Sequence, residues 1–166
     1  MTIAKKLDIS LHIIETSRLS DSLKNATSSQ DPYLRRNDVR LFGDVVSMYT
    51  MAATFAFIHG FDLIVLGINA DNVRAHPALN TSFFRTMEKL AGLWIGSRIR
   101  VLTPLLRKDK SSVMRIGARL GVPYVDTWSC GVNIEKHCGK CVECLARKEA
   151  FKEIGLPDPT EYECLG

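Results

Sequence analysis

The hydrophobic pattern near the N-terminus predicts a short β-strand. Ile9, Leu11 and Ile13 alternate with polar residues, and this period of two places the apolar side chains on one face of a strand. We therefore expect a strand over residues 9–15, preceded by the end of a helix. Residues 16–30 are rich in Ser, Asn, Thr and Asp, whose side chains bond to nearby backbone groups, so this segment predicts an irregular loop.

A longer apolar repeat follows, with helical rather than strand spacing. Apolar residues recur every three or four positions after residue 38, which predicts a long and largely buried helix that runs to about His59. Asn37 or Asp38 can cap the start of this helix, and Gly60 supplies its stop.

Two apolar runs further along the chain predict buried strands. Residues 62–68 form a continuous apolar run, as expected where helices cover both faces of a parallel sheet, and residues 99–102 form a second run. Between them, Asn80 or Thr81 opens a helix that extends to about Leu93.

A further helix follows the second strand. Asp109 can cap its start, and Gly121 marks its end. This alternation of strands and helices is typical of an α/β protein with a parallel sheet, whose functional loops lie at the carboxyl ends of the strands.

The composition fits one folded, water-soluble domain. The chain has 166 residues, of which 46% are hydrophobic and 24% charged, as in ordinary globular proteins. The 22 Lys and Arg residues exceed the 18 Asp and Glu residues too slightly to predict a nucleic-acid surface. We find no apolar run of signal-peptide length at the N-terminus and none of the ~18 residues that a membrane span requires, so we expect a cytoplasmic protein.

Four of the five cysteines cluster near the C-terminus and predict a zinc site. Seven residues separate Cys130 from Cys138, and two residues lie in each of the gaps to Cys141 and Cys144. In a reducing compartment such a cluster indicates metal ligands or catalytic thiols rather than disulfides. Four soft ligands suit tetrahedral zinc, and Gly139 lets the backbone turn sharply between them. Basic residues nearby can offset the charge of four thiolates; they are Lys136, Lys140, Arg147 and Lys148.

Other interpretations of these cysteines stay open, namely a redox dithiol, an iron–sulfur cluster, or thiols that are close by chance. Two overlapping Cys-x-x-Cys pairs with a fourth cysteine nearby favour a closed structural site, because a catalytic zinc ion normally keeps one position open for water. His137 is an alternative to one of the thiols, although it directly precedes Cys138. We expect Cys164, near the terminus, to be a bystander.

Three C-terminal segments, residues 122–130, 135–144 and 147–155, closely resemble the end of the 7-cyano-7-deazaguanine synthases. The similarity covers nearly the whole chain and is strongest after residue 97. Further matches fall in the order and spacing of that family, at Arg36-Asn37 and at residues 67–71, 104–106 and 110–113.

The resemblance implies a fold. Members of this family look like PP-loop ATP pyrophosphatases, with a three-layer, Rossmann-like parallel sheet of the adenine-nucleotide alpha-hydrolase-like type. It therefore implies an incomplete domain of this type over residues 1–126, with a zinc-binding segment over residues 127–166 packed on it.

The resemblance also implies an ATP-dependent ligase that forms C–N bonds. Such enzymes use ATP with Mg²⁺ to adenylate 7-carboxy-7-deazaguanine, and ammonia displaces the good leaving group that adenylation creates. A second ATP-dependent step dehydrates the resulting amide to the nitrile, which feeds queuosine or archaeosine synthesis. The implied partners are these small molecules, with no membrane and no direct contact with nucleic acid.

Five residues would line the nucleotide or substrate pocket by the same resemblance, while no catalytic residue is assigned. Gly67 and Asn69 end the strand predicted over the apolar run, where glycine permits close approach of a ligand; a simple turn is the alternative. Lys110, at the amino end of its helix, could grip pyrophosphate or be an ordinary solvated lysine. Arg36 and Asn37 match the family's Arg-Asn pair, with helix capping as the alternative for Asn37.

One departure from the family is the lack of its Ser-Gly-Gly-x-Asp-Ser loop, whose backbone N–H groups form the pyrophosphate cradle. By resemblance, the sequence opens inside the second helix of the family fold, so that two central strands are missing. Our hypothesis is a truncated or split-gene product, inactive alone, whose N-terminal half is lost or supplied as a separate chain. A homodimer is a further arrangement that the sequence allows.

A second departure lies at residues 76–80, His-Pro-Ala-Leu-Asn, where the family typically has Tyr-Pro-Asp-Cys-Arg. Ala78 replaces an acid that could pair with the purine-like edge of a deazaguanine. Two alternatives therefore stay open, namely another PP-loop ligase in nucleobase modification and a non-catalytic, zinc-stabilised interaction module.

Overall fold

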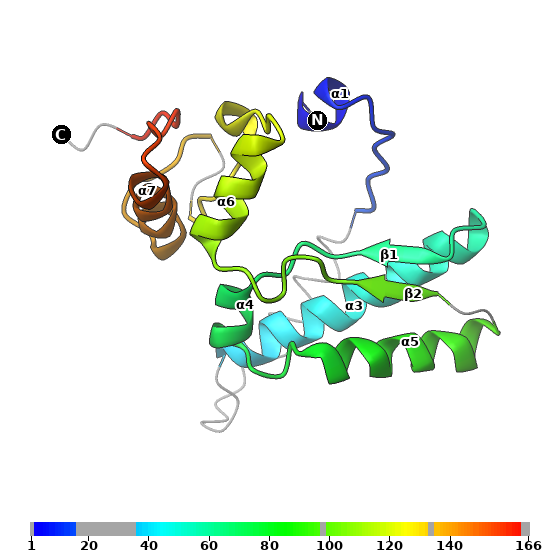
Figure 1. Ribbon diagram of the computed structural model, residues 1–166. Coiled ribbons are helices and arrows are strands. Elements are labelled where there is room, and N and C mark those ends of the chain that lie inside the picture. The colour runs from blue at the N-terminus through cyan, green and yellow to red at the C-terminus, as the bar shows by residue number, and fades with distance from the viewer. Residues whose placement is uncertain (1, 16–35, 97–98, 133–134, 164–166) are drawn as a thin grey trace. The chain divides into compact units, whose positions relative to one another are not determined.

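The computed structural model describes residues 2–15, 36–96, 99–132 and 135–163, without the side chains of residues 2 and 36–44 (Figure 1). Within these ranges no helix is both long enough and apolar enough to cross a membrane.

The chain divides into two compact units. One unit comprises residues 13–68 and 72–106, and we call it the sheet unit. The other unit comprises residues 1–12, 69–71 and 107–166, and we call it the cysteine unit.

A parallel pair of strands lies at the centre of the sheet unit. β1 (Leu63–Val65) pairs with β2 (Arg100–Leu102) in parallel, with Ile64 opposite Val101. The long helix α3 (Arg36–Ile58) packs on β1, α5 (Thr81–Ile95) packs on β2, and the two helices also contact each other. Both helices therefore cover the same face of the sheet, and the parallel α/β arrangement predicted from the alternating pattern is confirmed for these strands.

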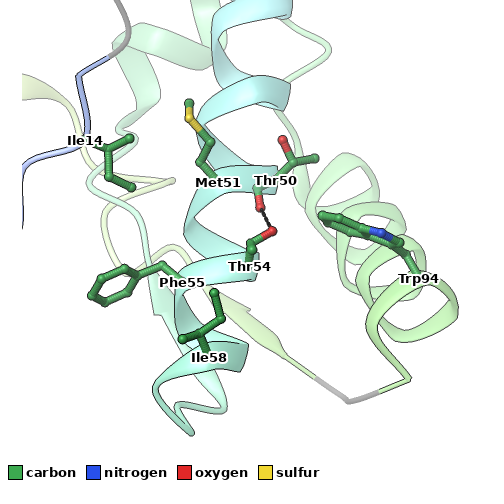
Figure 2. Close-up of a pocket in the computed structure, with 7 residues that line it drawn as sticks. All are labelled: Ile14, Thr50, Met51, Thr54, Phe55, Ile58 and Trp94. Carbon is green, nitrogen blue, oxygen red and sulfur yellow. Dashed lines mark hydrogen bonds between the residues drawn. The ribbon is translucent and has the colours of Figure 1, made fainter.

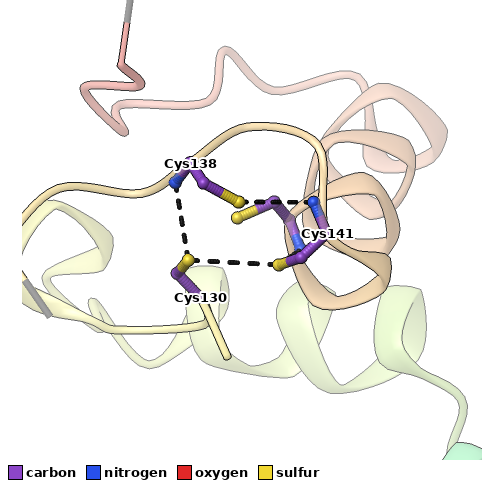
Figure 3. A group of neighbouring side chains, drawn as sticks. Cys130, Cys138 and Cys141 are labelled. Atoms are coloured by element: carbon purple, nitrogen blue, oxygen red, sulfur yellow. Dashed lines mark hydrogen bonds between the residues drawn. The ribbon is translucent and has the colours of Figure 1, made fainter. Parts of the chain in front are cut away.

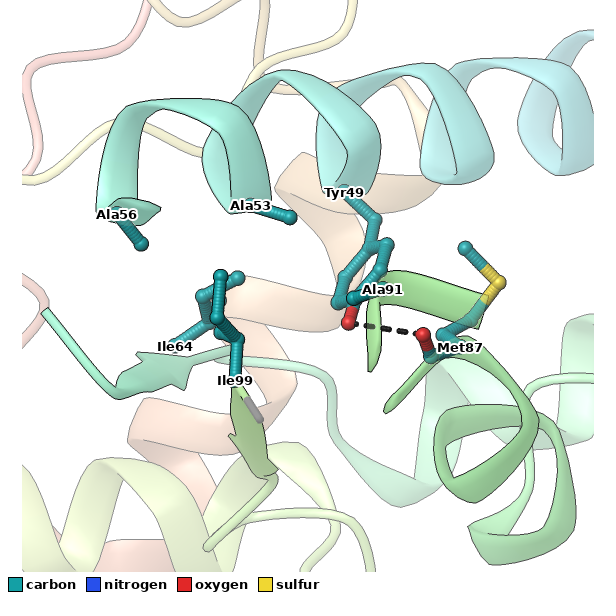
Figure 4. Close-up of a cluster of buried hydrophobic side chains, with 7 residues drawn as sticks. All are labelled: Tyr49, Ala53, Ala56, Ile64, Met87, Ala91 and Ile99. Carbon is teal, nitrogen blue, oxygen red and sulfur yellow. Dashed lines mark hydrogen bonds between the residues drawn. The ribbon is translucent and has the colours of Figure 1, made fainter. Parts of the chain in front are cut away.

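The core of the sheet unit lies between these two helices and the sheet. Alanines on the inner face of α3 let the helix approach β1 closely, because a methyl group adds little thickness. The hydroxyl of Tyr49 donates a 3.0 Å hydrogen bond to the carbonyl of Met87, which satisfies the one polar atom of the ring inside the core. Figure 4 shows the buried members of this core, which are Tyr49, Ala53, Ala56, Ile64, Met87, Ala91 and Ile99.

The apolar run of residues 62–68 forms a shorter strand than predicted, and the strand is buried on one side only. Ile64 faces the helices and is 8% exposed, whereas its neighbours Leu63 and Val65 are 38% and 58% exposed. Within the sheet unit, the described helices cover one face of this strand, and helices on both faces remain a prediction. A continuous apolar run cannot distinguish a strand covered on both sides from one whose second face is bare.

Several helix ends follow from their capping residues. The side chain of Asn80 accepts hydrogen bonds from the backbone N–H groups of Ser82 and Phe83 at the start of α5, as its capping role predicts. α3 ends at Ile58, and Gly60 adopts φ +73°, the left-handed conformation that confirms it as the stop.

Two expectations for the first 60 residues are corrected. Residues 9–15 form no strand in the described chain; after α1 (Thr2–Lys6) they continue as an irregular segment in which Ile9 and Ile13 are 59% and 70% exposed. An alternating pattern produces a strand only where a neighbour accepts its backbone hydrogen bonds. α3 already includes Arg36, so Asn37 and Asp38 lie within the helix instead of preceding it.

The cysteine unit contains two longer helices, of which the sequence pattern predicts only the first. α6 (Lys110–Arg119) is capped by Asp109 as predicted, whereas α7 (Val142–Ile154) has no counterpart among the predicted helices. The two helices pack together through Met114 and Phe151, among other residues. The short helix α4 (Ala70–Ala75), after the predicted strand-to-loop turn, is also absent from the prediction.

Candidate metal centre

The four clustered cysteines come together at the N-terminal end of α7. Their Sγ atoms all lie within 4.8 Å of one another, and the Sγ atoms of Cys130 and Cys141 are 4.0 Å apart. A tetrahedral ion with metal–sulfur bonds of ~2.3 Å requires sulfurs roughly 3.8 Å apart, and the distance between the Cys130 and Cys141 sulfurs is near this value. Figure 3 shows Cys130, Cys138 and Cys141 around this point. The four residues therefore form a group that could hold a metal ion.

Local backbone geometry positions the sulfurs. The N–H of Cys141 donates to the Sγ of Cys138 at 3.3 Å, and the N–H of Cys144 donates to the Sγ of Cys141 at 3.4 Å. A third bond of 3.4 Å joins the N–H of Cys138 to the Sγ of Cys130. Cys141 is also the N-cap of α7, where the positive end of the helix dipole favours a thiolate. Gly139 turns the chain with φ +73°, as its place between the cysteines predicts.

Burial affects the protonation of these thiols. Cys144 is fully buried, and burial, together with its bond to Cys141, raises the pKa of its thiol to about 12. Without a cation this thiol stays neutral near pH 7, and the neutral form is a poor metal ligand. A divalent ion would favour the thiolate and thereby offset the desolvation that raises the pKa.

His137 lies beside the cysteines but makes other contacts. Its Nε2 accepts a 3.1 Å hydrogen bond from the N–H of Ser129, and its ring centroid lies 4.1 Å from that of Trp128. Burial, followed by the charge of Arg147, lowers the pKa of His137, and this favours the neutral ring that accepts a hydrogen bond at Nε2. The group of four ligand atoms does not include His137. Cys164, the fifth cysteine, lies outside the described residues.

Arg147 has a role that the sequence did not reveal. Its side chain is 4% exposed and forms an ion pair of 3.3 Å with Asp158. It also donates to the hydroxyl of Thr127 at 2.7 Å and to the carbonyl of Tyr124 at 2.8 Å. Burial raises the pKa of Asp158, but hydrogen bonds from Thr160 and Tyr162 and the charge of Arg147 outweigh it and lower the pKa overall.

The other basic residues near the site differ in their contacts. The Nζ of Lys148 donates a 2.9 Å hydrogen bond to the carbonyl of Gly139, in the turn between Cys138 and Cys141. Lys136 and Lys140 are exposed to solvent. The predicted role of all four cations in offsetting thiolate charge remains a prediction.

The predicted pocket residues Asn69 and Lys110 both belong to the cysteine unit. The N–H of Ala70 donates to the carbonyl of Lys108 at 2.8 Å, so residues 69–71 lie beside the start of α6. The N–H of Lys110 donates to the carboxylate of Asp71, also at 2.8 Å. Burial and then the charge of Arg147 lower the pKa of the Lys110 ammonium group.

The remaining pocket residues are placed less completely. Gly67 follows β1 in the sheet unit and is exposed, in keeping with the turn that the sequence allows there. Arg36 and Asn37 lie in the first turn of α3, but their side chains lie outside the described part of the chain. Asp71, the last residue of the matched motif 67–71, is not among the site residues predicted from the sequence. Its place in this motif, two residues after Asn69, is the signal that could have indicated it.

The sheet unit also contains a shallow apolar hollow of about 430 Å³, which sequence reasoning did not find (Figure 2). Ile58 and Met51 of α3 and Trp94 of α5 contribute to its lining. Its Thr54 hydroxyl already donates to the carbonyl of Thr50 at 2.9 Å. A hollow with no charged lining residue lacks the groups that acid–base or phosphoryl chemistry needs.

A parallel α/β unit and a closed set of four cysteine sulfurs at a helix start define the class: an α/β protein with a candidate thiolate metal site. The family model of the queuosine biosynthesis protein QueC matches residues 1–155, and the chain belongs to this family. The kinship with 7-cyano-7-deazaguanine synthases that the C-terminal segments predict is thereby confirmed.

Several curated relatives carry the name 7-cyano-7-deazaguanine synthase. The protein from Thermoplasma acidophilum is 40% identical over 118 residues, which are 69% of this chain and 50% of that protein. The protein from Methanosphaerula palustris is 37% identical over 119 residues, 70% of this chain and 54% of that protein. The "7-cyano-7-deazaguanine synthase 2" of Sulfurisphaera tokodaii is 38% identical over 117 residues, 69% of this chain but 25% of that protein. The matched region thus spans between a quarter and about half of these relatives.

Proposed function

We propose that this chain carries part of a 7-cyano-7-deazaguanine synthase, the ligase that converts 7-carboxy-7-deazaguanine and ammonia to the nitrile with ATP. The observation that carries the proposal is the family match over residues 1–155. The names of the relatives support the same reaction. Since the matched region spans about half of these relatives or less, the activity is assigned to the whole protein of which this sequence would be a part.

We propose further that the four-cysteine site holds a structural zinc ion. Cys130, Cys138, Cys141 and Cys144 would supply all four ligands and leave no position open for water, so the ion would stabilise the fold without taking part in the reaction. The burial of three of these cysteines supports a closed site. Residues 127–166 would then be the zinc-binding segment of the protein.

By the family resemblance, five residues would contact the nucleotide or the substrate. Gly67 and Asn69, which follow β1 in the sequence, are two of them. Lys110 would contribute a positive charge toward the phosphates of ATP with Mg²⁺, and Arg36 and Asn37 complete the set carried over from the family. The two carboxylates at the start of α6, Asp71 and Asp109, accept hydrogen bonds from its N–H groups, so the Lys110 side chain rather than the helix end would face an anion.

The expected partners and location follow from this assignment. The phosphate-binding loop would come from an N-terminal half, in the same or a separate chain, and a homodimer would be a further level of assembly. The protein would act in the cytoplasm on small molecules, without direct contact with nucleic acid.

Ala78 favours a second candidate function. It lies in the exposed turn before α5 and offers no carboxylate to the edge of a deazaguanine. A related PP-loop ligase acting on another nucleobase carboxylate would not need that acid. A non-catalytic, zinc-stabilised interaction module is the third candidate, because the 166 residues contain no Ser-Gly-Gly-x-Asp-Ser segment.

An activity assay tests the assignment. The DNA upstream of the Met1 codon is read in all frames for a strand followed by Ser-Gly-Gly-x-Asp-Ser, and any such segment is produced together with this chain. We expect conversion of 7-carboxy-7-deazaguanine to the nitrile, detected by mass spectrometry, only with ATP, Mg²⁺ and ammonium present. ATP binding and turnover with a different carboxylate would favour the second candidate. Absence of ATP binding by calorimetry would favour the interaction module.

Metal analysis tests the zinc proposal separately. We expect about one zinc per chain in the purified protein and almost none in Cys141→Ser, with loss of helical signal from α7, because metal-binding free energy at such a site is folding free energy. Cys164→Ser is the matched control and should retain its zinc. Iron in place of zinc, or equal metal content in both variants, would contradict the proposal.

A further inference from the structure

The chain after α7 returns to the cysteine site. Residues 158–163, which we call the strap, end in an isolated parallel bridge between Tyr162 and His137. The N–H of Glu163 donates a 2.9 Å hydrogen bond to the carbonyl of His137. Because Cys138 is the next residue after His137, this backbone bond attaches the strap directly to the metal-binding loop.

The ring of Tyr162 lies against the cysteines. It packs on the cluster formed by Cys130, Cys138 and Cys144. It also closes over Gly139, since a methyl group added there would come within 3.3 Å of the Tyr162 ring. On the same ring, the Nζ of Lys148 lies 4.2 Å from the centroid, a cation–π contact. The aromatic ring thus covers the turn that presents the sulfurs.

A polar network fixes the strap in place. The Tyr162 hydroxyl donates to Asp158, and the N–H of Thr160 donates to the other oxygen of Asp158 at 3.0 Å. Asp158 is paired with Arg147, which continues to Thr127 on the segment leading to Cys130. The network therefore connects the strap to α7 and to the chain before the first cysteine.

We infer that the strap controls the release of the metal, with Tyr162 as its cover and Asp158 as its anchor. The inference rests on the proposed zinc site and adds a kinetic role for residues that are not ligands. A chelator removes the ion by displacing the sulfur ligands one after another. The partly exposed Cys141 would be the first ligand that it can reach. The strap limits the loosening of the loop at Cys138 and Gly139 that the later steps require.

Zinc release from the full chain tests this role. Zinc-loaded protein is mixed with excess 4-(2-pyridylazo)resorcinol, and the absorbance of the zinc complex gives the release rate. We expect Tyr162→Ala to release zinc at least about tenfold faster, in line with the effect of residues that support metal ligands. Tyr162→Phe, which keeps the ring but loses the bond to Asp158, should show a smaller increase. Glu161→Ala, an exposed neighbour on the strap, is the matched control and should match the unmodified protein.

The outcomes separate the strap from the zinc proposal. Asp158→Asn weakens the anchor but keeps the aromatic cover, so it supplies a second measurement if Tyr162→Ala does not fold. Zinc in the unmodified protein with equal release rates in folded Tyr162→Ala, Tyr162→Phe and Asp158→Asn would overturn the strap alone. A purified protein that neither contains nor binds zinc would overturn both proposals.

Discussion

The backbone N–H of Lys110 donates a 2.8 Å hydrogen bond to the carboxylate of Asp71, although 39 residues separate the two in sequence. The neighbouring bond from the N–H of Ala70 to the carbonyl of Lys108 has the same length. Together these bonds attach the segment that carries Asn69 to the first turn of α6. Two residues that the family resemblance assigns to one pocket, Asn69 and Lys110, are thereby held in the same unit.

Removing the Asp71 carboxylate should detach this segment. We expect Asp71→Ala to lower the free energy of unfolding by about 1–2 kcal/mol, the range for losing a hydrogen bond to a charged, partly exposed acceptor. Asp71→Asn retains an acceptor oxygen and should lose less than half of that. Urea denaturation of the metal-loaded protein measures both changes. Equal stability of Asp71→Ala and the unmodified chain would show that the segment is held by other contacts.

Lys110 should make stability depend on pH in the alkaline range. Burial, followed by the charge of Arg147, lowers the pKa of Lys110 below its ordinary 10.5. Between the lowered pKa and 10.5 the unfolded chain binds more protons than the folded chain, so stability rises with pH in this window. The buried charge therefore lowers the free energy of unfolding by its full amount below the lowered pKa, and it has no effect above pH 10.5.

The neutral variant Lys110→Met should therefore be more stable than the unmodified protein at pH 7. Its advantage should shrink as the pH approaches 10.5. Urea denaturation of both proteins across this range gives the difference between their free energies of unfolding. The contributions of other titrating groups are the same in both proteins and cancel in this difference. Lys108→Met, at an exposed position on the same loop, should show no such trend. A constant difference between Lys110→Met and the unmodified protein would contradict the assignment.

Loss of the buried cation Arg147 should be strongly destabilising. Arg147→Met leaves the carboxylate of Asp158, 14% exposed, without its charge partner, and we expect a loss of about 3 kcal/mol. The double variant Arg147→Met with Asp158→Asn leaves no orphan charge, so its loss should be smaller than the sum of the single losses. Lys152→Met serves as the control, since its pair with Glu149 is largely exposed and should contribute less than about 0.5 kcal/mol. Additive losses, measured by denaturant unfolding, would mean that the pair is not coupled.

Two helix glycines should respond in opposite directions to alanine. A methyl group on Gly117 of α6 would overlap the Tyr124 hydroxyl oxygen, and this hydroxyl is held by its bond to the carbonyl of Met114. We expect Gly117→Ala to cost about 1–3 kcal/mol through overpacking. Gly92 of α5 has no atom within 4 Å of the added methyl, so Gly92→Ala should gain about 0.5–1 kcal/mol. Thermal denaturation compares the two, and equal shifts in Tm would disprove the clash.

The outcomes for individual elements show which sequence signals were sufficient. Asn80 and Asp109 fix the starts of α5 and α6, because an N-cap acts on N–H groups only two or three residues away. The alternating pattern of residues 9–15 was not sufficient, since a strand needs a distant partner for its backbone groups. α7 was missed because its start is occupied by cysteines, which carry no helix signal in a pattern of apolar residues.

The sequence by itself determined the family and the grouping of four cysteines: four cysteines within 15 residues can meet at one point through short-range turns, and the structure brings their sulfurs within 4.8 Å. Only the tertiary structure decided what surrounds them. Arg147 pairs with Asp158 and Tyr162 covers Gly139 because α7 and the chain after it fold back on the loop. Such contacts depend on packing between segments, and the spacing of residues along one segment carries no record of it.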